Sequence, residues 1–144
     1  MNEETLKQVP LFAGLNKKEL QTLAKSCQER AYKPGATIIK QGDTGVGLYI
    51  ITQGHAKVTQ EQNPDRAEVT LNHVGPGDVL GEMALLDDLP RSASVIAEDE
   101  VTAVLLPVWE FRTALRSNPD IGVKLLSVLS HRLRNVQNPS HTHG

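Results

Sequence analysis

Short strand-like runs separated by glycine turns dominate the middle of the chain, and they restrict its fold more than any other feature. Between residues 30 and 106, glycines or Pro-Gly pairs recur at short intervals. The runs between them are ATIIK, LYIIT, AKVTQ, AEVTLNHV, ASVIA and VTAVLL. β-branched residues dominate, and several runs alternate apolar with polar positions, the period of a half-buried strand. This spacing predicts a β-roll of the double-stranded β-helix or jelly-roll type.

Helical patterns precede and follow this β region. Before it, Leu20, Leu23 and Ala24 share one helical face, and Asn16 with Glu19 three positions on is close to a capping box. After it, two helices are expected, and the second carries one apolar stripe. The members of that stripe, expected on the core or in part against a second subunit, are Ile121, Leu125, Leu126, Leu129 and Leu133.

The order of these patterns predicts one mainly β domain with flanking helices. An N-terminal helical segment covers residues 1–29, the β-roll 30–106 and the C-terminal helices 107–137. Residues 138–144 lack periodicity and are expected to form a disordered tail. A length of 144 residues fits one domain with a sizeable core. Aromatic residues make up only 3%, so aliphatic side chains must fill that core.

Charge and cysteine content argue against several classes of function. The net charge is −2 with a pI near 6.2, so no strong positive field draws this chain alone to nucleic acid or to an anionic membrane. Cys27 is the single cysteine, which excludes an internal disulfide, and we interpret it as a small apolar residue. The polar start MNEETLKQ is unlike a signal peptide, and no apolar run reaches membrane-spanning length. A cytoplasmic location is expected.

The stretch GEMALLDDLPRSAS, residues 81–94, combines groups that suit a small anion. Gly81 permits backbone torsions that other residues avoid and lets a ligand approach closely. A short helical turn is expected to open at Gly81–Glu82, and its first amides lack partners within the helix. Arg91 offers paired donors to phosphate oxygens, and the hydroxyl of Ser92 and nearby amides add more. These groups suit one singly charged phosphate, and no P-loop is present.

Glu82 would repel a phosphate, so it is expected to face another part of the ligand. A carboxylate accepts hydrogen bonds from a sugar hydroxyl, as acidic residues do for ribose in dinucleotide sites. Phosphate at Arg91 and ribose at Glu82 would lie adjacent in a 3′,5′-cyclic nucleotide, where they form one fused ring. A cyclic nucleotide is therefore the predicted ligand. The alternative is a surface ion pair between these two side chains, which is usually worth little.

Residues 81–94 resemble the phosphate-binding cassette of the cyclic nucleotide-binding domain family. That family includes bacterial catabolite activator proteins, regulatory subunits of cyclic nucleotide-dependent kinases and gated ion channels. Its pattern is Gly-Glu-x-Ala-Leu, a short spacer, then Arg-Ser/Thr/Ala-Ala-Ser/Thr. The residues in those places are Gly81, Glu82, Ala84, Leu85, Arg91, Ser92, Ala93 and Ser94. The run KPGATIIKQGDTGVGLYIITQGHAKV and the motif LFAGL are also similar, so the resemblance covers about residues 9–137.

The resemblance implies roles for individual residues. Arg91 would pair with the cyclic phosphate, with Ser92 and the Ala93 amide completing the contacts, and Glu82 would accept from the ribose 2′-hydroxyl beside the Gly81 backbone. The last helix, residues 120–137, would act as a lid over the base, with Arg132, Asn135 and Gln137 as polar candidates at the base edge. The remaining residues of the expected ligand-binding set are Met83, Ala84, Leu80, Val69 and Leu71, of which the last three are apolar candidates beside the base.

The implied function is that of a regulatory sensor without catalysis and without a cofactor. Its C-terminal helices would shift on ligand binding, and its output would pass to an effector protein or a second subunit. cAMP is favoured, because the spacer and the RSAS run resemble bacterial members; cGMP is the alternative, since the Ser92 hydroxyl can contact guanine. The chain stops at Gly144 without a helix-turn-helix domain, and Met1 favours a stand-alone sensor. The alternatives are the ligand-binding half of a DNA-binding transcriptional regulator and a piece of a channel or kinase regulator.

Other motifs are interpreted as structural. GDTGVG, residues 42–47, is expected to be a hairpin turn, because no long helix follows it. A cupin-type β-roll metalloenzyme would need a His-x-His pair on a strand. His141 and His143 form such a pair only in the tail, and His55, His73 and His131 are expected on the surface. No nucleophile–base arrangement is visible either, so neither an enzyme nor a metal site is expected, and a small β-roll metalloenzyme is kept as the less favoured alternative.

Overall fold

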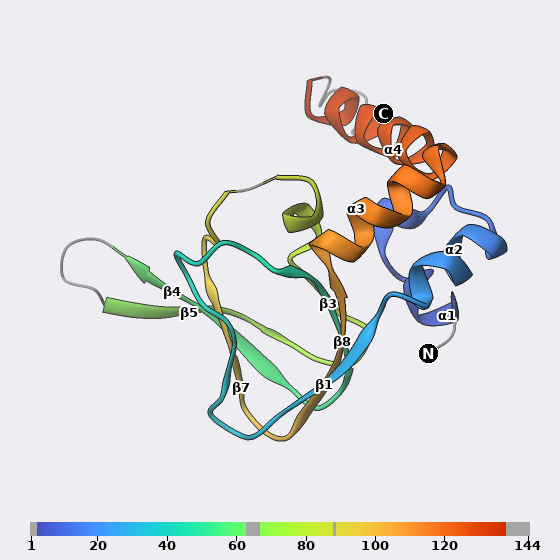
Figure 1. The fold of residues 1–144 in the computed structure, drawn as a ribbon. Helices are drawn as coiled ribbons and strands as arrows, with labels where there is room; N and C mark the ends of the chain where they lie inside the picture. The colour runs from blue at the N-terminus through green and yellow to red at the C-terminus, as the bar shows by residue number, and fades with distance from the viewer. Residues whose placement is uncertain (1–2, 63–66, 88, 138–144) are drawn as a thin grey trace.

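Two antiparallel sheets form the body of the molecule, and helices cover one side of it (Figure 1). The computed structural model describes residues 3–62, 67–87 and 89–137. One four-stranded sheet has the order β1 (Gln28–Tyr32), β8 (Val101–Pro107), β3 (Gly47–Gln53) and β6 (Val79–Leu80). The other has the order β2 (Thr37–Ile39), β7 (Ser94–Ala97), β4 (Ala56–Gln62) and β5 (Ala67–Val74). The predicted mainly β fold with flanking helices is confirmed.

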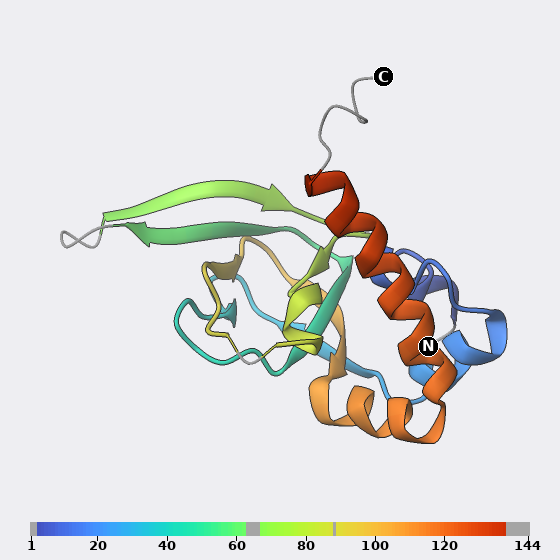
Figure 2. The same ribbon diagram turned by 90° about the horizontal axis from the view of Figure 1, so that it is seen from above.

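The helices come from both ends of the chain and meet in one cluster. At the N-terminal end are α1 (Glu3–Leu6), the 3₁₀ helix η1 (Pro10–Phe12) and α2 (Lys17–Ala24). A second 3₁₀ helix, η2 (Glu82–Leu85), follows β6, and α3 (Val108–Ser117) and α4 (Pro119–Gln137) follow β8. In Figures 1 and 2 the helices of both ends lie together, while the β4–β5 pair projects away from them.

Two hydrophobic clusters hold these parts together. The first joins the helices to the roll: Phe12 of η1 stacks on Phe111 of α3 with ring centroids 6.2 Å apart, and Leu85 of η2 belongs to the same cluster. The second fills the roll between the sheets with side chains such as Ile51 and Val95. Because η2 shares a cluster with η1 and α3, burial of apolar surface fixes the candidate cassette against both ends of the chain.

The cap predicted for α2 is present. The Asn16 side chain accepts from the Glu19 N–H, and the Glu19 side chain accepts from the Asn16 N–H, both at 2.9 Å. The same Glu19 carboxylate pairs with Lys124 of α4 at 2.6 Å, and this contact is the main reason that its pKa lies below the usual value. The cap therefore also ties α2 to α4.

The apolar stripe expected on the last helix is divided in the structure. Ile121 and Leu125 are buried in the core, and Leu129 packs partly against it. Leu126 and Leu133, by contrast, are 67% and 58% exposed. These two side chains do not face the core of this chain, because only one side of α4 rests on the domain, and packing of part of the stripe against a second subunit stays a prediction. None of the helices in residues 3–62, 67–87 and 89–137 is long and apolar enough to cross a membrane.

Several elements differ from the sequence prediction. β1 begins at Gln28, inside the segment 1–29 that was expected to be helical, and β6 was not predicted. The segment GDTGVG is not a hairpin turn, because β2 pairs with β7 and β3 pairs with β8 in the other sheet. Residues 42–46 therefore cross from one sheet to the other. The predicted tail, 138–144, lies outside the described residues.

Candidate functional site

Gly81 begins the local structure of the cassette. It caps η2 with φ 72° and ψ 28°, in the left-handed region that residues with a Cβ rarely adopt. β6 ends at Leu80, so Gly81 turns the chain directly from the sheet into the 3₁₀ helix. The turn predicted at Gly81–Glu82 is therefore present, as one short 3₁₀ helix.

The Arg91 guanidinium lies between two glycine backbones. A Cβ on Gly45 would come 2.5 Å from Arg91 Nε, and a Cβ on Gly81 would collide with Arg91 Nη1. Arg91 Nη2 donates to the Gly47 carbonyl oxygen at 2.6 Å. The absence of side chains at Gly45 and Gly81 thus makes the space that the guanidinium occupies.

Arg91 carries a half-buried positive charge. Desolvation lowers the pKa of its guanidinium, while the nearby Tyr49 and Asp87 act in the opposite direction. A guanidinium stays ionised at any working pH, so the charge itself persists. Within the described part of the chain, no carboxylate lies at ion-pair distance from Arg91. This arrangement favours an anion beside the guanidinium, because a buried charge is stabilised by an opposite charge.

The loop between β2 and β3 fixes the backbone of Arg91. The Arg91 N–H donates to the Asp43 carbonyl oxygen at 2.8 Å, and the Gly42 N–H donates to the Arg91 carbonyl oxygen at 2.9 Å. Thr44 forms an isolated bridge with Pro90. Sequence reasoning missed this wall of the site, although the three glycines of GDTGVG were a signal for close backbone approach.

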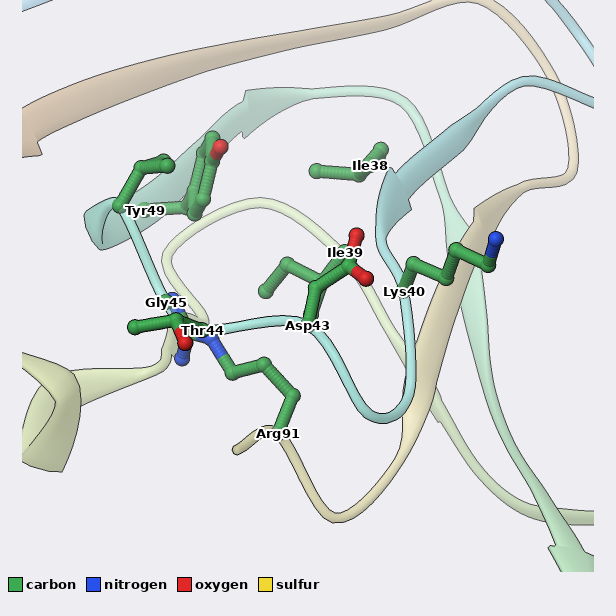
Figure 3. A pocket seen from close by; sticks show the side chains of 9 residues that line it. Ile38, Ile39, Lys40, Asp43, Thr44, Gly45, Tyr49 and Arg91 are labelled. Carbon is green, nitrogen blue, oxygen red and sulfur yellow. The ribbon is translucent and has the colours of Figure 1, made fainter. Parts of the chain in front are cut away.

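Two pockets meet at Arg91. The larger has a volume of about 410 Å³. Its lining residues are Gly81, Glu82, Met83, Ala84, Asp87, Leu89, Pro90, Arg91 and Ser92. The smaller, about 120 Å³, lies between the β2–β3 connection and core residues that include Ile39 and Tyr49 (Figure 3). Six residues of the expected ligand set are thus brought together around one open volume.

Glu82 is held by two other segments. Its Oε2 accepts from the Leu11 N–H at 2.7 Å, and its carboxylate pairs with Arg132 Nη2 at 3.2 Å. The carboxyl-bearing side chain is only 17% exposed. Arg132, expected at a base edge, contacts Glu82 and lies 4.0 Å from the Met83 sulfur. Sequence reasoning missed Leu11, because a backbone N–H 71 positions away leaves no local pattern.

The other expected residues are more scattered. Leu80 is buried in the roll beside Tyr49, and Ala93 is half-buried next to the cassette. Val69 and Leu71 are 40% and 49% exposed, because β5 is an edge strand with little covering it, and they do not line the pocket. Asn135 is exposed, and Gln137 is the last residue of α4.

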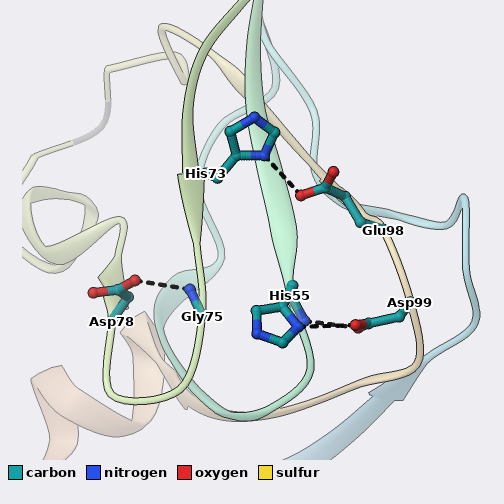
Figure 4. Close-up of polar contacts among 6 residues, drawn as sticks. All are labelled: His55, His73, Gly75, Asp78, Glu98 and Asp99. Atoms are coloured by element: carbon teal, nitrogen blue, oxygen red, sulfur yellow. Dashed lines mark hydrogen bonds and ion pairs between the residues drawn. The ribbon is translucent and has the colours of Figure 1, made fainter.

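Exposed histidines pair with carboxylates on a separate surface (Figure 4). His55 Nδ1 lies 2.9 Å from Asp99, and His73 Nδ1 lies 2.8 Å from Glu98. The contacts from His55 hold the pKa of Asp99 below its usual value. Among the described residues, no group of three or more His, Cys, Asp or Glu could hold a metal ion. His141 and His143 lie outside that part of the chain.

The thiol of Cys27 lies in an environment that makes it poorly reactive. Cys27 is partly buried against the first core cluster, and its Sγ donates to the Leu23 carbonyl oxygen at 3.5 Å. Burial raises the pKa of the Cys27 thiol to about 12. The thiolate is the reactive form, so this cysteine is a poor nucleophile at neutral pH.

Comparison with known proteins identifies relatives of this chain. The family model described as "Cyclic nucleotide-binding domain" matches residues 29–118. The chain is 33% identical over 136 residues to the CRP-like cAMP-activated global transcriptional regulator of Mycobacterium tuberculosis. That match covers 94% of this chain and 60% of the regulator, so the chain spans less than two thirds of the length of its relative.

Solved structures give the same result. The N-terminal domain of a transcriptional regulator from Streptomyces coelicolor has a TM-score of 0.85 and 32% identity, with 94% of each chain covered. The regulatory domain of Toxoplasma gondii PKA, crystallised with cAMP, has a TM-score of 0.74 and 27% identity. That comparison covers 94% of this chain and 49% of the other. These relatives are regulatory proteins by name. The fold, the cassette and the match over residues 29–118 together show that the chain belongs to the cyclic nucleotide-binding domain family.

Proposed function

We propose that this domain binds cAMP, and cGMP more weakly, with the cyclic phosphate against Arg91 and Ser92. The observation that carries the proposal is the half-buried Arg91 guanidinium, which faces a pocket and lacks a carboxylate partner among the described residues. The names of the relatives support cAMP over cGMP. No step of bond breaking enters this proposal, because the ligand acts by binding alone.

Glu82 would couple the ligand to the helices. In the structure its carboxylate accepts from the Leu11 N–H and pairs with Arg132 of α4. A ribose 2′-hydroxyl that donates to the same oxygens would compete with both. Ligand binding would therefore weaken one contact that holds α4 in place. The ligand shifts the position of α4 only to the extent that it binds the two arrangements with different affinity.

The exposed side of α4 is the surface that we assign to output. Leu126 and Leu133 on this helix are largely exposed, and a partner that covers them would sense a movement of α4. The partner is an effector protein or a second subunit. A longer protein with an attached DNA-binding domain is the second candidate, because the matched regulator is substantially longer than this chain.

Calorimetric titration with cAMP, cGMP and 5′-AMP tests the proposed ligand. We expect one cAMP per chain, weaker cGMP, and 5′-AMP weakest of all. 5′-AMP has an open-chain phosphate that carries a second charge, and Arg91 is placed to meet one singly charged ring phosphate. Equal affinity for cAMP and 5′-AMP would contradict the assignment, and so would a lack of heat with all three.

The contact between Glu82 and Arg132 gives a test of the coupling. In Arg132→Ala we expect faster amide exchange along α4 without ligand, and a smaller further change when cAMP is added than in the unmodified chain. The loss of stability should stay below about 1 kcal/mol, because the pair is partly exposed. Arg116→Ala, on the exposed end of α3, is the matched control. If α4 exchanges alike in Arg132→Ala and the unmodified chain, this contact does not hold the helix.

A further inference from the structure

The side chain of Gln60, on β4, is bonded to the backbone of the cassette. Its Nε2 donates to the Ser92 carbonyl oxygen at 2.9 Å, and its Oε1 accepts from Gln62 Nε2 at 3.1 Å. The second contact orients the amide of Gln60 so that its NH₂ group faces the cassette. Ser92 lines the larger pocket, whereas Gln60 does not, so a ligand in that pocket would touch the cassette but not Gln60.

This side chain supplies a partner at the point where the pairing of the two strands ends. β4 pairs with β7 as far as Thr59, which faces Ser94, the first residue of β7. Ser92 precedes β7 and lies in a bend, so the backbone of β4 does not pair with it. The Ser92 carbonyl oxygen is bonded by the half-buried Gln60 side chain instead.

The same hydrogen bond fixes the direction of the Ala93 N–H. The Ser92 carbonyl and the Ala93 N–H belong to one planar trans peptide, in which the two groups point to opposite sides. Because the carbonyl points toward Gln60, the N–H points away from it. In the described part of the chain, the Ala93 N–H donates to no other backbone group, so it is available to a ligand.

The preceding peptide is fixed by the backbone alone. The Arg91 carbonyl oxygen accepts from the Gly42 N–H at 2.9 Å, so the Ser92 N–H points away from Gly42. Of these two successive N–H groups, the first is therefore oriented by the main chain and the second by one side chain. Without that side chain, the peptide between Ser92 and Ala93 can rotate and turn its carbonyl oxygen toward a bound phosphate, where the two negative ends repel each other.

We propose that Gln60 is a positioning residue for the phosphate, which holds the Ala93 N–H toward the bound cyclic nucleotide. The inference rests on the proposed function, because it needs a phosphate beside Arg91. Donors that are already oriented bind an anion more tightly, since binding then costs less ordering of the cassette. Loss of one charge-assisted hydrogen bond corresponds to roughly a tenfold loss of affinity.

Gln60→Met tests this role, because it keeps the length of the side chain but removes its donor. By calorimetric titration we expect roughly tenfold weaker cAMP binding. The melting temperature should stay within about 2–4 °C of the unmodified chain, since the lost contact is partly exposed. Gln53→Met is the matched control, because Gln53 is an exposed glutamine at the end of β3, and it should bind cAMP like the unmodified chain.

NMR spectra of the full chain separate positioning from a general loss of structure. In the unmodified chain we expect the Ala93 amide proton to move downfield when cAMP is added, because its N–H then donates to the phosphate. In Gln60→Met this downfield shift should be smaller, while the change at the Gly81 amide, at the start of the cassette, is retained.

The outcomes distinguish this role from the proposed function. If the unmodified chain binds no cAMP, the proposed function fails and the role of Gln60 fails with it. If the chain binds cAMP and Gln60→Met keeps full affinity, only the role of Gln60 is overturned. The same conclusion follows if the Ala93 amide shifts equally in both chains, or if affinity is lost only together with a large drop in melting temperature.

Discussion

Arg91→Ala is expected to weaken cAMP binding by at least about a hundredfold. A guanidinium makes paired, charge-assisted hydrogen bonds to a phosphate, and each such bond contributes about 1.5–3 kcal/mol. The loss of two bonds removes about 3–6 kcal/mol, and every 1.4 kcal/mol is a factor of about ten in affinity. Calorimetric titration of the variant with cAMP measures this directly.

The same substitution should leave the fold intact. Arg91 has no carboxylate partner in the described residues and is partly desolvated, and its side-chain hydrogen bond goes to one carbonyl, that of Gly47. We therefore expect a melting temperature that is unchanged or slightly higher. Arg91→Lys keeps the positive charge but lacks the paired donors of a guanidinium. We therefore expect its affinity for cAMP to lie between those of the unmodified chain and Arg91→Ala. Arg116→Ala is the control for loss of a surface charge. Unchanged affinity in Arg91→Ala would remove Arg91 from the phosphate site.

The strands that sequence reasoning found are those with a clear local pattern. AEVTLNHV matches β5 over the same residues, because turn signals bound it on both sides. β1 was missed, since QERAY has no apolar alternation, and four of its five residues are exposed. Its place in the sheet is set by pairing with β8, about seventy positions along the chain. Pairing over that distance leaves no trace in a local window.

The residues of the candidate site also fall into two groups, those with a local sequence pattern and those without one. Gly81, Glu82 and Arg91 could be found because they lie in one short stretch. Their partners could not, because Gly47 is 44 positions from Arg91 and Arg132 is 50 from Glu82. The hairpin interpretation of GDTGVG also failed at this point. Which sheet a short strand joins depends on distant pairing, and here that pairing places the glycines against Arg91.

Three glycine variants separate backbone strain from displacement of Arg91, and their effects should be large. Gly35 has φ 85° and open space around it, so Gly35→Ala adds strain alone. Gly45 has ordinary torsions, but a Cβ there would meet Arg91 Nε and the Ala84 Cβ, at 2.5 and 2.7 Å. Gly81 combines both, with φ 72° and a collision with the guanidinium. A left-handed residue with a Cβ costs about 1–2 kcal/mol.

Gly35→Ala is therefore expected to lower the free energy of unfolding by about 1–2 kcal/mol and to leave cAMP affinity unchanged. Gly45→Ala should lose affinity on the order of Arg91→Ala, about a hundredfold, because the guanidinium is pushed out of its place. Gly81→Ala should show both losses. Denaturant unfolding and calorimetric titration on the same three samples measure them. Wild-type affinity in Gly45→Ala would mean that Arg91 does not need the space between the two glycines to hold the ligand, and the geometry assigned to the phosphate would then be wrong.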